Sequence, residues 1–299
     1  MRRPFQLATS LLVAFVLLLA ASAGTSAHQA GTTFLKPKPA HGGNPKHGTN
    51  LFSHGGSIES SPKVYIVFWG SEWSSAGSAQ AYVTSFFSGV GGSTWASSTT
   101  QYCQGVPNGT SVCASGTVRP DNKSGQLAGN WNDSATVPAS PTQNDIANEA
   151  ARLASHFGGV NASADYMVFT PSGHSENGFG TVWCAYHSSS GSLSYSYIPY
   201  QPDAGAACGQ NFVNSGGNGQ LDGFSIVGGH EYAETITDPF PNSGWLDSRG
   251  AENADKCAWI SSGQGAAANI SLTTGTFAAQ SLWSNAFNGG AGGCVLSYP

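Results

Sequence analysis

Acidic side chains crowd into one short stretch of the chain. Only 16 of its 299 residues are Asp or Glu, yet six of these fall between positions 230 and 255. Carboxylates at this density repel one another unless a positive group lies among them, and Arg249 is the only Lys or Arg inside the stretch. A bound cation is therefore the economical explanation, and the neighbouring His230 supplies a nitrogen ligand. The six acidic residues are Glu231, Glu234, Asp238, Asp247, Glu252 and Asp255.

The spacing of these residues predicts a metal centre that performs hydrolysis. His230 and Glu234 are four apart, so on a helix they lie on the same face and can bind one ion. Glu231 stands where the general base stands in the His-Glu-x-x-His metalloproteases. Glu252 resembles the distant Glu ligand of thermolysin-like zincins. Asp255 resembles the nearby Asp that orients a ligand in those enzymes. We therefore expect His230, Glu234 and Glu252 to bind Zn²⁺.

The pattern departs from the zincin motif at its second ligand, which is Glu234 here rather than His. Replacing nitrogen by oxygen hardens the site and adds negative charge, so Ca²⁺ and Mn²⁺ become competitors of Zn²⁺. The alternative explanation is a helix end with solvated acids, in which His230 is a capping or core histidine. Asp238 lies eight residues after His230 and directly before Pro239, so we expect it to end the helix rather than bind the ion.

A helix must carry this motif, and the apolar residues around it predict one. Phe224, Val227 and Ala233 recur at helical spacing, which predicts a helix over 223–237. The glycine pair 228–229 inside it costs helix stability, which indicates close approach to a strand or a substrate. The fold class is therefore α+β, with a mixed sheet packed against the helix that carries the motif. Apolar runs predict strands over 64–69 and 166–170 and a hairpin of 181–187 with 193–200. Helical periods predict a helix over 78–88 and another over 142–157, which begins at a Thr142 cap.

The N-terminus and six cysteines indicate an exported protein. An arginine pair precedes an apolar run over 11–21, which predicts a signal peptide over 1–27. We expect a flexible segment over 28–51 and a single catalytic-type, zincin-like domain over 52–299, stabilised by disulfides. No later run is long enough to span a membrane in the mature protein. Sequence proximity favours, among the possible connectivities, the pairs Cys103–Cys113, Cys184–Cys208 and Cys257–Cys294.

Charge and motif content exclude several classes of protein. The formal net charge is −5, and removal of a signal peptide that contains two arginines makes it more negative, which excludes a nucleic-acid partner. There is no Cys-x-x-Cys pair for a thiolate zinc or redox site and no Gly-x-Ser-x-Gly nucleophile elbow. A two-carboxylate glycosidase has no specific motif but stays open, since a pair within the acidic stretch could lie at the needed separation.

Five short motifs follow one another between about residues 52 and 260. They are His54-Gly55-Gly56, the strand and glycine over 64–70, Cys184-Ala185-Tyr186-His187, His230-Glu231-Tyr232-Ala233-Glu234 leading to Asp238-Pro239, and Glu252-Asn253-Ala254-Asp255-Lys256-Cys257. In this order they resemble the EXORDIUM (phosphate-induced protein) family of plants and its bacterial relatives. The resemblance implies a secreted, wall-associated or apoplastic protein. It also makes His54 and His187 candidate site residues. In the hydrolytic mechanism, we expect His187 or Tyr186, from a neighbouring strand, to steady the oxyanion.

Two functions from different classes follow from these observations. The leading hypothesis is a secreted zincin-like metallohydrolase, in particular a zinc-dependent peptidase acting on peptide or protein substrates. The competing hypothesis is a non-catalytic extracellular protein with a structural cation, whose exposed aromatic rings meet cell-wall polysaccharide. A structural site fills its coordination with protein ligands, whereas a catalytic site keeps one position open to a cleft. The aromatic candidates are Trp73, Trp95, Trp131, Tyr195 and Tyr197.

Overall fold

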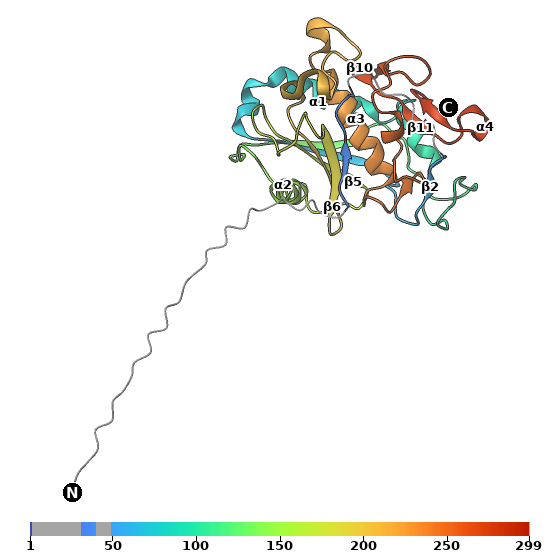
Figure 1. Cartoon of the computed structure of the whole chain (residues 1–299), viewed down its shortest axis with the longest axis horizontal. Coiled ribbons are helices and arrows are strands. Elements are labelled where there is room, and N and C mark those ends of the chain that lie inside the picture. The colour runs from blue at the N-terminus through green and yellow to red at the C-terminus, as the bar shows by residue number, and fades with distance from the viewer. Residues whose placement is uncertain (2–30, 40–48, 299) are drawn as a thin grey trace.

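Six strands form the main sheet of the protein (Figure 1). A computed structural model describes residues 31–39 and 49–298 together with Met1, so the rest of the predicted signal peptide over 1–27 lies outside the described residues. The strands are β1 (Thr33–Leu35), β3 (Lys63–Trp69), β4 (Leu127–Asp133), β5 (Ala164–Phe169), β6 (Ala185–Ser190) and β7 (Leu193–Ile198). Their order is β1-β6-β7-β5-β3-β4, in which β4, β3, β5 and β7 run parallel and β6 is antiparallel to both of its neighbours.

Smaller elements complete the described part of the chain. Two-stranded sheets pair β2 (Phe52–Ser53) with β8 (Trp245–Leu246), β9 (Ala268–Leu272) with β10 (Gly275–Ala279), and β11 (Leu282–Ser284) with β12 (Gly293–Val295). The α-helices are α1 (Gly77–Val90), α2 (Gln143–His156), α3 (Asp222–Thr237) and α4 (Phe287–Gly290). Short 3-10 helices span Ser71–Ser75, Ala96–Gln101, Gln201–Cys208, Gly216–Gly219 and Asp255–Cys257. Among the described residues, no helix combines the length and the apolar character needed to cross a membrane.

Helices cover both faces of the main sheet. In β3, Ile66 and Phe68 point into a core shared with α1 and α3, whereas Val67 and Trp69 pack with α2 on the other face. This alternation is the period of an extended strand that is buried on both sides. The apolar run over 64–69 is confirmed as a central strand, because β3 lies between β5 and β4.

Helix α3 is buried along its whole length. Every one of its residues is shielded from solvent, because β6 and β7 of the main sheet lie on one side and β10 lies on another. A Cβ on Gly228 would lie 3.2 Å from the ring of Phe87 on α1, and a Cβ on Gly229 would be equally close to Trp95. The close approach predicted from this glycine pair is therefore made to aromatic rings, and the prediction of a strand or a substrate there was wrong.

The predicted cap of α2 and the predicted disulfides are confirmed. The Thr142 hydroxyl accepts a hydrogen bond from the backbone N–H of Asp145, and the Asp145 carboxylate accepts one from the backbone N–H of Thr142. This reciprocal capping box satisfies two backbone donors at the start of the helix. All six cysteines are paired, as Cys103–Cys113, Cys184–Cys208 and Cys257–Cys294.

Two segments differ from their predictions. Part of the 28–51 segment, predicted from its composition to be flexible, forms β1 and buries Leu35 to 1% exposure. This strand forms because β1 pairs with the exposed edge of β6, and Leu35 packs into the apolar core. The hairpin predicted for 181–187 with 193–200 is confirmed, but its first strand begins only at Ala185, because backbone bonds to Gly178 fold the preceding residues into turns.

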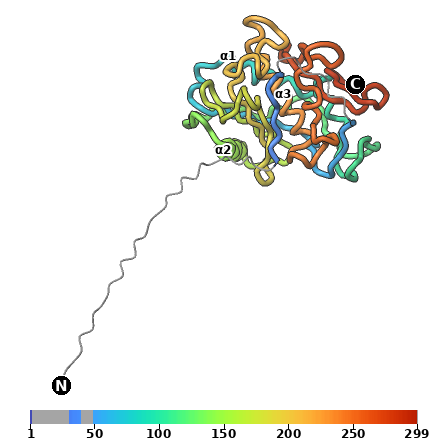
Figure 2. The backbone as a smooth tube through the Cα atoms, viewed as in Figure 1, coloured from blue at the N-terminus to red at the C-terminus, as the bar shows by residue number. Residues whose placement is uncertain are grey.

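The C-terminal part of the chain packs against residues that are far away in the sequence. Figure 2 shows the red C-terminal segment beside the teal segment near residue 100. The Tyr102 hydroxyl donates to the carbonyl of Trp283 at 2.6 Å, and the Trp245 indole N–H donates to the carbonyl of Cys103 at 2.7 Å. These buried bonds connect the two halves of the chain around α3.

Replacing Thr142 by alanine tests the capping box. We expect Thr142→Ala to lower the free energy of unfolding by about 1 kcal/mol, because one backbone N–H at the start of α2 loses its acceptor. Urea-induced unfolding followed by circular dichroism measures the change. The control is Ser155→Ala, an exposed position near the end of the same helix; equal midpoints for the two variants would contradict the assignment.

Candidate metal centre

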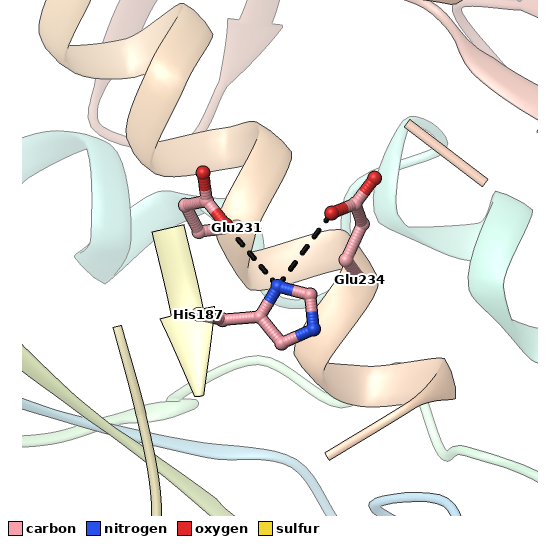
Figure 3. A group of neighbouring side chains, drawn as sticks. All are labelled: His187, Glu231 and Glu234. Carbon is pink, nitrogen blue, oxygen red and sulfur yellow. Dashed lines mark hydrogen bonds and ion pairs between the residues drawn. The ribbon is translucent and has the colours of Figure 1, made fainter. Parts of the chain in front are cut away.

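A group of ionisable side chains lies in the core around one turn of α3. The side chains of His230, Glu231 and Glu234 have 0% exposure. His187 on β6 and Glu252 in the loop after β8 are equally buried, and the packing of β6 on α3 brings His187 over the helix (Figure 3). The group is therefore closed to solvent.

His230, Glu234 and Asp255 form one set of converging ligand atoms. The Nε2 atom of His230 lies 3.1 Å from Oε1 of Glu234 and 3.7 Å from Oδ1 of Asp255. The three ligand atoms all lie within 4.8 Å of one another. The backbone N–H of Asp255 also donates to Glu234 Oε1 at 2.9 Å, which fixes the loop against the helix. One cation can contact an atom from each of the three residues.

His187, Glu231 and Glu234 form a second converging set, drawn in Figure 3. The Nδ1 atom of His187 lies 3.2 Å from Oε2 of Glu231 and 3.6 Å from Oε2 of Glu234. The other ring nitrogen, Nε2, faces Oε1 of Glu252 at 3.4 Å. The ring of His187 therefore lies between carboxylates on two sides, and all of them are buried.

Gln280, at the end of β10, determines which nitrogen of His230 is free. Its amide NH₂ group donates to the carbonyls of Ala254 and Ser281, so its oxygen must face His230 Nδ1, at 3.1 Å. Nδ1 then carries the proton and donates it to Gln280, which leaves the Nε2 lone pair directed at Glu234 and Asp255. No spacing in the sequence pointed to Gln280, and the one available signal is a polar residue directly after the apolar run Phe277–Ala279.

The pKa values of these groups are strongly shifted. Burial would lower the pKa of His230, but Glu234 and Asp255 raise it to about 9. Burial would also lower the pKa of His187, but Glu231 and Glu234 raise it to about 9. Burial also holds the pKa of Glu231 well above its usual value, against the effect of His187. The cluster therefore attracts positive charge, which protons on the rings or a divalent cation can supply.

Several buried polar atoms of the cluster make no hydrogen bond. Nε2 of His187 and both carboxylate oxygens of Glu252 are among them, as are three atoms in the converging sets, namely Nε2 of His230, Oε1 of Glu231 and Oε2 of Glu234. A buried polar atom without a partner costs stability, and such atoms are rare in proteins. These three atoms belong to residues whose ligand atoms converge, so an ion among them would satisfy what the protein alone does not.

The structure brings together most of the residues predicted to bind the ion, but Asp255 and Glu252 exchange the contacts predicted for them. His230 and Glu234 are one turn apart and face each other, as their spacing predicts. Asp255, predicted to orient a ligand, is the residue that reaches His230. Glu252, predicted as the third zinc ligand, faces His187 instead. Asp255 lies beside His230 because its backbone N–H donates to Glu234 Oε1, which holds the start of the 3-10 helix Asp255–Cys257 against α3.

Three further candidates lie away from the converging atoms. His54 stacks on Phe52, with ring centroids 4.7 Å apart. Tyr186 alternates with His187 along β6, so it packs in the core on the α2 side, and its hydroxyl donates to Glu176. It cannot steady an oxyanion at the α3 side of the sheet. Asp238 ends α3 as predicted, and its carboxylate accepts backbone N–H bonds from residues 242–244.

The aromatic residues proposed to meet polysaccharide are mostly buried. Trp73 and Trp95 are 1% exposed, and Tyr195 and Tyr197 are 0% exposed. They fill the two cores of the sheet, as expected for most aromatic side chains, so these four residues form no exposed aromatic surface. Trp131 is half-buried, and it stacks on the ring of His156.

Comparison with known proteins adds no relative from which a role could be transferred. No protein-family model matches the chain, and no curated protein or solved structure matches it either. A functional conclusion therefore rests on the residues and the geometry of the centre, because function resides in sites rather than in folds.

Removing the acceptor behind His230 tests the role of Gln280. We expect Gln280→Leu to weaken Zn²⁺ binding by about 10- to 100-fold, because the ring loses the hydrogen bond that fixes its free nitrogen. Competition with a chromophoric zinc chelator at neutral pH measures the affinity. Gln80→Leu, at a half-buried position on α1, is the matched control. Wild-type affinity in Gln280→Leu would show that the ring is held by other contacts.

Proposed function

We propose that the protein is a secreted metal-dependent hydrolase, specifically a zinc peptidase with a single zincin-like domain. The convergence of His230, Glu234 and Asp255 on one point carries the proposal. One imidazole nitrogen held in its tautomer, together with two carboxylates, suits Zn²⁺ or Mn²⁺ better than Ca²⁺, which prefers oxygen ligands alone. The resemblance to the EXORDIUM family supports an extracellular setting, and so do the three disulfides.

The residues around this point can perform the hydrolysis of a peptide bond. A zinc ion, when bound, supplies a Lewis acid that makes water acidic and polarises a carbonyl. Glu231 accepts the proton of water at Oε1 as the water oxygen attacks the carbonyl carbon, and it passes that proton to the amine as the C–N bond breaks. Burial raises the pKa of Glu231, which suits a group that must both take and return a proton. His187 contacts Oε2 of the same carboxylate and holds it in position.

Access to the centre is through Asp255. Its side chain is 21% exposed, whereas the side chains of His230 and Glu234 are fully buried. A substrate carbonyl therefore approaches from the Asp255 side, where an ion would be closest to solvent. Peptides enter such a site only if the loop that carries Asp255 moves, since no cluster residue other than Asp255 reaches the surface.

A second candidate function follows from the burial of the cluster. All five of its residues other than Asp255 are fully buried, as expected for a structural cation whose coordination is filled by protein ligands. In this case the ion ties β6, α3 and the Glu252–Asp255 loop together in a non-catalytic extracellular protein. Removing the ion would then lower stability without ending any reaction.

The proton acceptor is tested by Glu231→Gln in the zinc-loaded protein. We expect peptide hydrolysis to fall by at least about 100-fold, because an amide cannot accept the proton, while one zinc ion stays bound near His230. A peptide-library cleavage assay and metal analysis of the same sample give the two readouts. Glu72→Gln, an exposed acid outside the cluster, is the control. Retained turnover in Glu231→Gln would remove Glu231 from the mechanism.

An open coordination position separates the two candidate functions. We expect a peptide hydroxamate to bind the zinc-loaded protein and not the protein stripped with a chelator, because the hydroxamate oxygens need a free position on the metal. Isothermal titration calorimetry measures binding, and the O-methylated hydroxamate is the control ligand. A zinc-loaded protein that ignores the hydroxamate and cleaves no peptide would support the structural cation instead.

A further inference from the structure

The two oxygens of Glu234 point to different histidines. Oε1 lies 3.1 Å from Nε2 of His230, and Oε2 lies 3.6 Å from Nδ1 of His187. Glu234 is accordingly the one residue common to both converging sets in the described part of the chain. A carboxylate in this position can give one oxygen to each of two cations, which lie about 3.5–4 Å apart in two-metal centres.

His187 has the arrangement that prepares an imidazole for metal binding. Its Nδ1 makes a hydrogen bond with Glu231 when no ion is bound, and its Nε2 lies 3.4 Å from Glu252 Oε1 without a hydrogen bond. With the proton of a neutral ring on Nε2, beside Glu252, the lone pair of Nδ1 is directed at Glu231 and Glu234. His230 has the corresponding arrangement with a hydrogen bond behind it, since Gln280 contacts one nitrogen and two carboxylates lie in front of the other. Acceptors behind metal-binding histidines fix the ring and its tautomer.

The buried carboxylates of the cluster are paired only with histidine among the described residues. Glu231, Glu234 and Glu252 are fully buried, and their ion pairs there are with His187 and His230. Oε2 of Glu234 makes no hydrogen bond. This unpaired atom indicates a ligand on the His187 side as well as on the His230 side.

We propose that the cluster is a two-cation centre bridged by Glu234. The first cation contacts His230 Nε2, Glu234 Oε1 and Asp255 Oδ1, and the second contacts His187 Nδ1, Glu231 Oε2 and Glu234 Oε2. Zn²⁺ and Mn²⁺ both fit these nitrogen and carboxylate ligands. The proposal rests on the metal-dependent function above and adds to it, since one cation could hold the attacking water while the other polarises the carbonyl oxygen of the peptide. Glu231 Oε1 stays available to accept a proton.

Metal stoichiometry tests the second site directly. The chelator-stripped protein is incubated with Zn²⁺, desalted and analysed by plasma mass spectrometry. We expect two zinc ions per wild-type chain, one in His187→Ala and one in His230→Ala, and a loss of both from Glu234→Ala. His156→Ala, an exposed histidine, should keep two. Circular dichroism and a thiol assay confirm that each variant is folded with its disulfides formed.

A measurement on the wild type covers the case in which a variant fails to fold. Two Mn²⁺ ions bridged by one carboxylate give the electron paramagnetic resonance spectrum of an exchange-coupled pair, whereas isolated Mn²⁺ gives a six-line signal. The coupled spectrum in Mn²⁺-loaded wild type is the expected result. One ion per chain, with an uncoupled signal and no effect of His187→Ala, would overturn the second site and leave the proposed function intact. No ion in the wild type would overturn both.

Discussion

The burial of charge around α3 is the constraint on which the rest of the structure depends. A helix shielded on every side can be stable when its side chains are apolar, but α3 carries His230, Glu231 and Glu234 on two successive turns. Ionised groups survive in a protein interior only when they are paired or bind a cation. His230 and Glu234 pair with each other within α3, and the fold brings their further partners from β6, from the loop after β8 and from the residue after β10. The antiparallel insertion of β6 into an otherwise parallel set places His187 directly above the helix.

Local patterns in the sequence were sufficient to predict the elements and part of the site. The apolar period around the His-Glu motif predicted α3, the Thr142 cap predicted α2, and nearness in sequence predicted all three disulfides. The i, i+4 spacing also predicted that His230 and Glu234 face each other, because one helical turn separates them whatever the tertiary structure. These predictions share one property, namely that each depends on geometry within a few turns or one chain segment.

Predictions that depended on tertiary geometry were less successful. Spacing alone could not decide between Glu252 and Asp255 as the partner of His230, since each contact depends on how their loop packs against α3 and β6. Gln280 lies 50 residues from His230 and follows no period, so only the folded chain reveals its contact. β1 gave no signal because three residues of a Pro- and Lys-rich segment become a strand only where β6 offers an edge. Pairing energy from a distant strand outweighed local composition there.

The positions of the disulfides bear on when such a centre is assembled. Cys184–Cys208 begins three residues before His187, and Cys257–Cys294 begins two residues after Asp255. Each ligand-bearing segment outside α3 is thus anchored covalently next to its ligand. In a reducing compartment those segments lose their anchors, and the ligands are not held at a common point. For the proposed centre, oxidative folding would therefore precede metal loading, and its maturation in a secreted protein would depend on the metal supply outside the cell.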